Sequence, residues 1–299
     1  MKKLLISIVT SLILISGIHA QNKIDLAGVS FYYNPKVGLR EAPGQEFDDL
    51  KYNVSEIKAF VLVPFQLKNQ RTMLITGAKW HFVNAPFDNF PSGKSFNVNL
   101  HSFQVNLGID QKFSEKWGGV VMLRPTLASN FRGGISGEDF YLQGSVALHR
   151  RFSEKLRIGA GVGNTIGFGE PKTVVVLLVD YNTEKFSLKV NAPAMLDLKF
   201  TSRKMQYGFK AELEGGQYHL SNLKGDGPVV AELSAIKFSR YNVGPTLGWN
   251  LEGEMRMEIS AGYSLNRILK TLDPEGVETN YDLKPGGFLR IGFFLGRNK

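Results

Sequence analysis

The chain has 299 residues, a formal net charge of +9 and no cysteine. The absence of cysteine excludes a disulfide framework and thiolate chemistry. A basic balance would also suit nucleic acid, but the first residues predict export, so we expect anionic lipid or solute rather than nucleic acid as the partner.

The first twenty residues are predicted to be a secretory signal peptide. A pair of lysines is followed by an apolar run and by Ile18-His19-Ala20, a suitable cleavage site before Gln21. The apolar run is too short to span a bilayer comfortably. We therefore expect cleavage after Ala20 and a single domain over residues 21–299. No later segment approaches the length of a transmembrane helix.

Polar and apolar residues alternate along much of the remaining chain. From Met255 to Leu265, the odd positions are Met, Met, Ile, Ala, Tyr and Leu, and the even ones are Arg, Glu, Ser, Gly and Ser. Successive side chains of a strand point to opposite faces, so such a segment has one apolar and one polar face. In chain order, the candidate strands lie near 24–33, 51–65, 71–84, 97–112, 117–128, 139–152, 155–168, 172–182, 185–192, 194–201, 204–214, 236–251, 254–266 and 283–296.

Short and long connections alternate between these segments. The short turns are at 68–70, 114–116, 153–155, 182–184, 202–204 and 252–254. The longer Gly/Pro/Asn-rich links are at 34–50, 85–96, 130–138, 215–235 and 269–282. Bacterial outer-membrane barrels have short periplasmic turns and longer external loops. An even number of strands would put all the short turns and both termini on the periplasmic side.

Two local features refine this prediction. Around Leu100–Phe103 the apolar positions switch from even to odd, which suggests a β-bulge. Aromatic residues gather beside the short turns, which is typical of an interfacial girdle. They are Phe113, Trp117, Phe152, Tyr181, Phe186, Tyr207 and Trp249.

The sequence therefore predicts an all-β protein, a single antiparallel transmembrane β-barrel of about 14 strands, with 12 as the alternative. A soluble β-sandwich or a periplasmic up-and-down barrel would show the same alternation. The long strands, the turn asymmetry and the small, polar second face favour the membrane barrel. We expect the protein in the outer membrane.

Several diffuse motifs resemble an uncharacterised outer-membrane β-barrel family, a domain of unknown function, of Bacteroidetes-type bacteria. They are the segments 24–33, Val61-Leu-Val-Pro-Phe65, 123–131 with Glu138-Asp-Phe140, Phe168-Gly-Glu-Pro171 and Asn191-Ala-Pro193. The resemblance spans essentially the whole mature chain. It implies the fold and the membrane but no activity and no site. The chain departs from the usual terminal aromatic, because five residues follow Phe294.

Charged residues on the polar faces are expected to line the lumen. On the lipid face such charges would cost about 2–4 kcal/mol near the bilayer midplane. The candidates are Arg157, Lys189, Asp197, Lys199, Lys210, Glu212, Glu254, Arg256, Glu258 and Arg290. They would either pair and fill a narrow interior or line a water-filled pore with a slight basic bias.

An enzymatic site is a weaker hypothesis. His219 and Ser221 have the spacing that puts two side chains on one face of a strand, about 6–7 Å apart. Some outer-membrane lipid hydrolases use such a pair, but a histidine base needs a third group to orient it. The sequence names no such group, so no catalytic residue is assigned.

Other motifs have simpler explanations. The glycines of Gly159–Gly163 lack the GxGxxG spacing and a following helix, so a nucleotide site is not expected. Asp273-Pro-Glu-Gly276 is better explained as a turn than as a calcium loop. The histidines are scattered, and we expect no metal and no cofactor.

These features favour passage of a small, perhaps anionic, solute through a porin-like lumen. The alternatives are a closed structural or surface-binding barrel and, less favoured, the lipid hydrolase. Lipid and lipopolysaccharide of the outer membrane are the expected partners.

Overall fold

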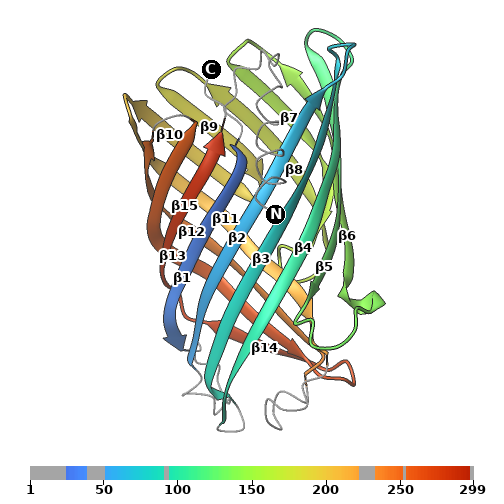
Figure 1. Ribbon diagram of the computed structural model, residues 1–299, viewed down its shortest axis with the longest axis vertical. Coiled ribbons are helices and arrows are strands. Elements are labelled where there is room, and N and C mark those ends of the chain that lie inside the picture. Colours follow the sequence, from blue (N-terminus) through green and yellow to red (C-terminus); the bar gives the residue numbers. More distant parts are fainter. Residues whose placement is uncertain (1–24, 39–50, 91–93, 222–232, 252–253, 297–299) are drawn as a thin grey trace, which may run out of the picture.

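The computed structural model describes residues 25–38, 51–90, 94–221, 233–251 and 254–296. The predicted signal peptide lies outside these residues. Fourteen strand positions form a closed antiparallel barrel, as predicted (Figure 1). Each strand from β1 to β13 pairs with the next, and β15 closes the barrel by pairing with both β13 and β1. Within the described ranges, no helix is long and apolar enough to cross a membrane.

The strands are β1 (Asp25–Gly38), β2 (Lys51–Gln66), β3 (Thr72–Phe90), β4 (Lys94–Lys112), β5 (Trp117–Ser129), β6 (Phe140–Arg151), β7 (Leu156–Thr165), β8 (Lys172–Asn182), β9 (Phe186–Ala192), β10 (Met195–Ser202), β11 (Met205–His219), β12 (Ala235–Asn250), β13 (Met255–Leu272), β14 (Glu278–Leu283) and β15 (Gly286–Gly296). A short 3-10 turn, η1 (Gly137–Asp139), precedes β6. β14 and β15 both pair with β13. β14 pairs with Arg267–Leu272, and β15 pairs with Met255–Ser264. They occupy one strand position, interrupted at Lys284-Pro285.

The short turns lie at one end of the barrel, as expected for the periplasmic side. The repeated Phe-Ser-Glu-Lys sequence builds the same turn twice. The N–H of Phe113 donates to the carbonyl of Trp117, and that of Phe152 donates to Leu156, both at 2.9 Å. The hydroxyls of Ser114 and Ser153 accept N–H groups of the same turns. The serine therefore satisfies backbone donors that the turn would otherwise leave unpaired.

An apolar belt surrounds the half of the barrel that carries the short turns. Its side chains point away from the lumen and are about half exposed, as lipid-facing residues of a membrane barrel are. Near the turns the belt includes exposed aromatic rings, among them Trp117 and Phe152. The guanidinium of Arg150 stacks over both rings, 5.4 and 5.0 Å from their centroids. An amphipathic cation at this level keeps its charge in the headgroup layer.

The polarity of the two barrel faces inverts partway along β4. Phe103, Val105 and Leu107 face outward and are exposed. Earlier in the same strand, Val98 and Leu100 face inward and are buried. The predicted bulge at Leu100–Phe103 is wrong, because the registers with β3 and β5 run through this segment without a shift. The apolar residues change face because the surroundings change. On one side of the boundary the outer face is apolar, as a lipid-facing wall is, and on the other side the inner face is apolar because it covers a core.

The same inversion occurs in β2, where buried Tyr52 and Val54 precede buried Glu56 and Lys58 on the inner face. We call the part with the apolar outer face the membrane half, and the part with the apolar inner face the external half. The external half lies at the bottom of Figure 1.

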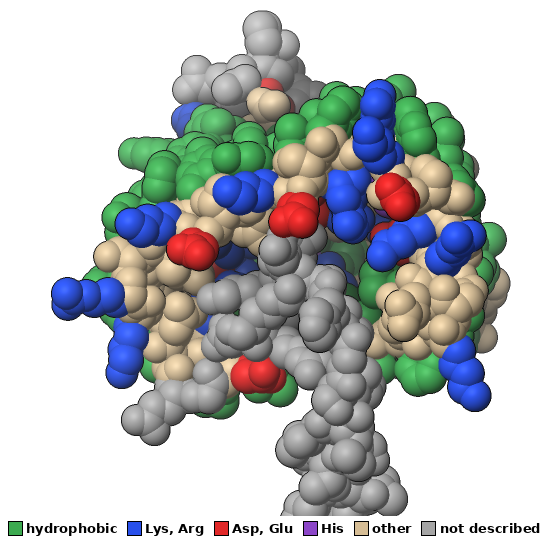
Figure 2. Space-filling view, turned by 90° about the horizontal axis from the view of Figure 1, so that it is seen from above, with side chains coloured by type: hydrophobic (Ala, Val, Ile, Leu, Met, Phe, Trp, Pro, Cys, Tyr) green, Lys and Arg blue, Asp and Glu red, His purple; other side chains and the backbone are tan. Residues whose placement is uncertain are grey.

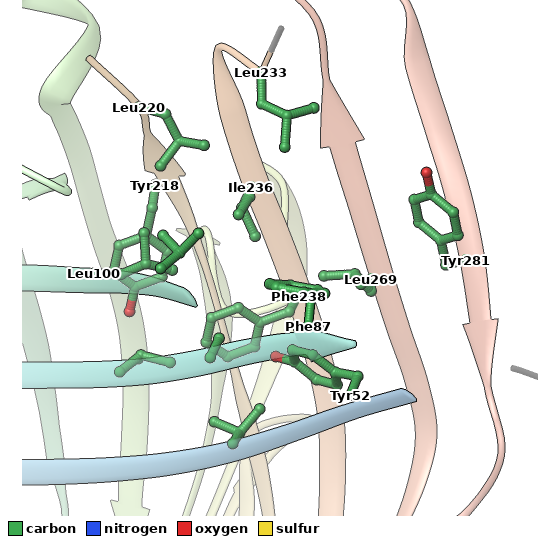
Figure 3. Close-up of a cluster of buried hydrophobic side chains, with 14 of the residues drawn as sticks. Tyr52, Phe87, Leu100, Tyr218, Leu220, Leu233, Ile236, Phe238, Leu269 and Tyr281 are labelled. Carbon is green, nitrogen blue, oxygen red and sulfur yellow. The ribbon is translucent and has the colours of Figure 1, made fainter. Parts of the chain in front are cut away.

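The external half is enclosed by fewer strands. β7 to β10 have 7 to 11 residues each and do not extend into it. Beyond them, β11 crosses to β5, where His219 pairs with Ser129 in parallel. An apolar core fills the space between β2–β5 and β11–β14 (Figure 3). It consists of Tyr52, Val54, Val83, Ala85, Phe87, Val98, Leu100, Ala128, Tyr218, Leu220, Leu233, Ile236, Phe238, Leu269, Tyr281 and Leu283.

Four predicted external links prove to contain strand, including 34–50, which β1 enters as far as Gly38. β3 and β4 continue through most of 85–96, β11 continues to His219, and β14 occupies part of 269–282. These segments are rich in Asn, Pro and Asp, which resemble loop residues in a sequence. In the structure Asn84 and Asn99 lie on the outer face of the external half, where their amides hydrogen-bond to each other at 2.8 Å. A wall facing water tolerates such residues.

A β-bulge does occur, in β13. Asn266 has φ 47°, and the register with β12 shifts between Ser239 and Tyr241. The extra residue reverses the facing of the following side chains. Leu265 therefore points outward, whereas Arg267 points into the barrel with 1 % of its surface exposed.

Candidate functional site

The lumen of the membrane half is lined by charged side chains from many strands. A row of alternating charge crosses five neighbouring strands, because each member pairs in register with the next. Its members are Arg157, Asp180, Lys189, Asp197 and Lys210. The Arg157 Nη2 donates to Asp180 at 2.7 Å. Opposite charges directly across a strand pair stabilise the sheet and leave a polar inner wall.

A second cluster surrounds Glu258 on β13. Its carboxylate accepts a hydrogen bond from Arg290 at 2.6 Å, and Lys199 lies 3.0 Å away. Arg256 lies 3.7 Å from the same carboxylate and donates to Asp25 at 2.9 Å. Because Glu258 is 2 % exposed, three cations around one carboxylate provide the compensation that a buried charge requires.

A third cluster marks the boundary between the two halves. Glu56 on β2 forms an ion pair with Arg240 on β12 and lies 2.7 Å from the His81 ring on β3. Lys58 forms an ion pair with Glu214 on β11. β2 and β11 are not neighbours in the sheet, since β1, β15, β13 and β12 lie between them, so these contacts cross the lumen next to the apolar core.

Buried polar atoms without a hydrogen-bond partner gather on this inner wall. The described residues with such side-chain atoms are Asn34, Asp197, Gln206, Gln217, Arg240, Asn242, Arg256, Glu258, Ser260, Arg267 and Arg290. A small cavity of about 10 Å³ lies among Tyr32, Glu212, Asn242 and Arg290. Buried polar groups normally find a partner in protein, water or ligand. The inner wall is therefore suited to hydration.

Most of the predicted lumen residues lie on this inner wall. The exception is Glu254, which is exposed in the turn before β13, where its carbonyl accepts from Gly296. The sequence prediction missed Glu56, Lys58, His81 and Glu214, although an inward charge beside outward apolar neighbours was a usable signal. β2 and β3 did not read as regular strands, because both faces change character at the boundary, whereas Glu214 continues the regular polar face of β11.

The periplasmic end presents a mixed but mainly basic rim. Figure 2 shows lysine and arginine side chains around this end, interspersed with fewer acidic ones, and apolar side chains on the outer wall behind them. Lys116 and Lys155 of the repeated turns and Arg151 are exposed members of the rim. A basic rim attracts anions toward the barrel end.

At the external end, β11 and its continuation form a strap across to β5 and η1. The N–H of Asn130 donates to the His219 carbonyl at 3.2 Å, and the N–H of Ser221 donates to the Asn130 side chain at 3.1 Å. The His219 ring lies between two carboxylates, with Nδ1 at 2.8 Å from Asp139 and Nε2 at 2.9 Å from Glu138. We call this contact the strap clasp.

Asp139 is the buried member of the strap clasp. Desolvation acts to raise the pKa of its carboxyl group. Hydrogen bonds from the Ser136 N–H and from the His219 and Ser129 side chains outweigh desolvation and hold the pKa below its usual value. Asp139 is therefore ionised over the ordinary pH range and can orient His219.

The arrangement does not couple His219 to Ser221. Asp139 provides the orienting carboxylate that the sequence could not name, but Glu138 occupies the second ring nitrogen. The hydroxyl of Ser221 instead accepts from the Gly133 N–H at 3.0 Å and donates to Asn130 at 3.3 Å. A serine nucleophile needs its hydroxyl on the histidine base.

The remaining motifs are structural. A Cβ at Gly161 would lie 2.0 Å from the Val146 carbonyl, so close strand approach accounts for this glycine. In the turn Asp273–Gly276, the Asp273 carboxylate accepts the N–H of Val277 at 2.8 Å. Across the described part of the chain, no group of three or more His, Cys, Asp or Glu could hold a metal ion.

A family model described as a domain of unknown function, DUF6268, matches residues 16–296. No curated protein sequence matches the chain. Among solved structures, the fold is similar to a deltaS2 mutant of the monoaromatic hydrocarbon channel TodX, with TM-score 0.46, 10% identity and coverage of 91% and 90% of the two chains. It is also similar to the COG4313 outer membrane channel from Pseudomonas putida F1, with TM-score 0.44, 11% identity and coverage of 95% and 100%. At these identities the likeness concerns the fold alone.

Proposed function

The chain belongs to the DUF6268 family, and we propose that it is a selective outer-membrane channel for a small anionic solute, closed at its external end in this structure. The observation that carries this proposal is the inner wall of the membrane half. It combines dense charge with buried polar atoms that have no hydrogen-bond partner within the described residues. A wall of this kind is compatible with water and a polar solute in a way that an apolar filling is not.

Anion preference follows from the balance of charge on the inner wall. Lys79, Arg124 and Arg267 make no ion pair with any described residue, whereas the buried carboxylates Glu56, Glu214 and Glu258 are all paired. A surplus of fixed positive charge concentrates anions in a lumen and repels cations. The predicted lumen residues Arg157, Lys189, Lys210 and Arg290 belong to the same wall.

The proposal includes location and partners. We place the mature protein in the outer membrane after removal of the signal peptide at Ala20. The apolar belt contacts lipid, and the external half lies on the lipopolysaccharide side. The predicted export signal and the belt of lipid-facing side chains support this placement.

A closed structural barrel is the second candidate. The apolar core and the ion pairs that bridge the lumen favour it, because both fill the cross-section with protein. The two candidates differ in whether the external end opens.

Conductance of the refolded mature protein in a planar bilayer separates them. The channel proposal predicts discrete, infrequent current steps with preference for chloride over potassium. It also predicts that Lys79→Gln lowers this preference, while Lys51→Gln, an exposed charge at the external end of β2, leaves it unchanged. Silence from folded protein would favour the structural barrel.

A further inference from the structure

Arg267 is a buried cation whose charge is uncompensated by the part of the protein that the structure describes. It is 1 % exposed, and neither Nη1 nor Nη2 has a hydrogen-bond partner there. No carboxylate of the described residues forms an ion pair with it, and Glu56, on the same inner wall, is already paired with Arg240. A buried charge without a partner is strongly unfavourable, and a bound anion would supply the missing compensation.

The backbone is arranged to place this guanidinium inside the barrel. Without the bulge at Asn266, Arg267 would share the outward direction of Leu265. Gly286, at the start of β15, leaves room for the guanidinium, because a Cβ there would lie 2.6 Å from Nη1. The bulge therefore turns the side chain of Arg267 into the barrel, and the glycine leaves space for its guanidinium there.

The surroundings combine positive charge with an apolar surface. Arg240 lies close enough to interact electrostatically with Arg267, and Tyr52 lies near both. Leu269 follows Arg267 on the same inner face, and Leu283 pairs with Arg267 across the strands. The guanidinium therefore lies at the floor of the apolar core, where the external half meets the charged lumen.

The wall beside this position is interrupted. Among the described residues β14 pairs in the sheet with β13, and between Leu283 and Gly286 the strand position is interrupted. A backbone hydrogen bond of 3.1 Å from Lys284 to Gly38 links this interruption to β1.

We propose that Arg267 binds the carboxylate of a small amphipathic anion, a short-chain carboxylic acid whose apolar tail lies against Tyr52, Leu269 and Leu283. This inference deepens the proposed function and rests on it, since it names the class of solute. A guanidinium fork matches a carboxylate with two parallel hydrogen bonds. An apolar tail suits the core above it, whereas a fully polar anion would lose hydration there without compensation.

Binding of hexanoate to the refolded full chain in lipid nanodiscs, measured by titration calorimetry, tests the proposal. We expect saturable binding of hexanoate, weaker binding of acetate and no saturable binding of hexanol, which has the same tail without the charge. Arg267→Gln should weaken hexanoate binding roughly tenfold to a hundredfold, the range expected for loss of a charge-assisted hydrogen-bonded pair. Arg151→Gln, the same substitution at an exposed position on the periplasmic rim, should leave it unchanged.

Three results would overturn the proposal. They are absence of hexanoate binding, equal affinity of both arginine variants and the wild type, and binding of acetate or chloride as tight as that of hexanoate. The hexanol and acetate comparisons use only the wild type, so they decide the matter even where a variant fails to fold. Hexanoate binding without any conductance would refute the channel and retain the site. Conductance without hexanoate binding would refute the site and retain the channel.

Discussion

Glu56 is the residue on which the lumen-bridging contacts converge. It is 1 % exposed, forms an ion pair with Arg240 and lies beside His81 and Lys58. Removing one partner of a buried ion pair leaves the other charge unpaired, which costs more than the pair itself contributes. A substitution of Glu56 is therefore expected to lower the free energy of unfolding strongly.

We expect Glu56→Gln to lower the free energy of unfolding by about 3–5 kcal/mol. The amide is isosteric, so the loss comes from the stranded Arg240 charge rather than from a cavity. Urea unfolding of the refolded barrel in lipid bilayers measures it. Glu154→Gln, an exposed carboxylate in a periplasmic turn, is the control and should change stability by less than about 0.5 kcal/mol. Equal effects at both positions would contradict the assignment of Glu56 as a buried ion-pair partner.

The strap clasp should weaken in acid. The folded-state pKa of Asp139 lies below its usual value, so its ionised form stabilises the clasp. That contribution is complete above the unfolded-state pKa, about 4, and is lost as pH falls through the lower folded-state value. Hydrogen exchange of the amides in residues 130–139 should rise below about pH 4, after correction for intrinsic rates. Asp139→Asn should remove most of this pH dependence, and a persistent dependence in that variant would assign it to another group.

Among the strands, β4 shows most clearly where the outer face of the wall changes from polar to apolar. Asn99 and Val105 both point outward from this strand, on opposite sides of the boundary. The sequence shows the boundary as a change of parity, and a bulge was the simpler interpretation of that change. The register shows instead that one regular strand passes from a wall with apolar outside to a wall with apolar inside.

Arginine at these two positions should have very different effects. Val105→Arg places a charge on the lipid face and should cost about 2–4 kcal/mol of folding free energy if the site lies near the midplane. Asn99→Arg should cost close to nothing, because that face is in water. The comparison is matched in strand, face and introduced residue, and urea unfolding in bilayers measures it. Similar costs at both positions would refute the boundary at Phe103.

Inward positions of the same strand should show the reverse pattern. Leu100 is fully buried in the apolar core, so Leu100→Ala should cost about 2–5 kcal/mol. Gln104 lies on the same inner face in the membrane half and is partly exposed to the lumen. Gln104→Ala should change the unfolding free energy by less than about 1 kcal/mol, and a cost equal to that of Leu100→Ala would argue against a separate external core.

At the scale of the whole molecule, local alternation predicted the barrel, its strand number and the side on which the short turns lie. It also predicted most of the inner wall, because β7 and the membrane-half segments of β11 and β13 keep one polar face. The external half could not be predicted in this way. Its core is assembled from β2–β5 and β11–β14, and the contact that encloses it, between His219 and Ser129, joins strands far apart in the chain. A pattern with a period of two residues carries no information about such pairing.

The strap determines whether this architecture is a channel. Asn130 holds the strap through its side chain, which donates to the Ser221 carbonyl at 3.0 Å and accepts from the Ser221 N–H at 3.1 Å. The same side chain also accepts from the Ser221 hydroxyl at 3.3 Å. Asn130→Ala removes these three bonds without altering the apolar core or the lumen charges. Because the strap closes the gap above the short strands, its release should raise the frequency of open events in a planar bilayer while leaving their ion selectivity unchanged. Asn84→Ala, which removes amide bonds on the outer face of the external half, is the control and should conduct as the wild type does. An Asn130 variant that folds, releases the strap by hydrogen exchange and remains silent would mean that the apolar core itself seals the barrel, and would favour a structural role.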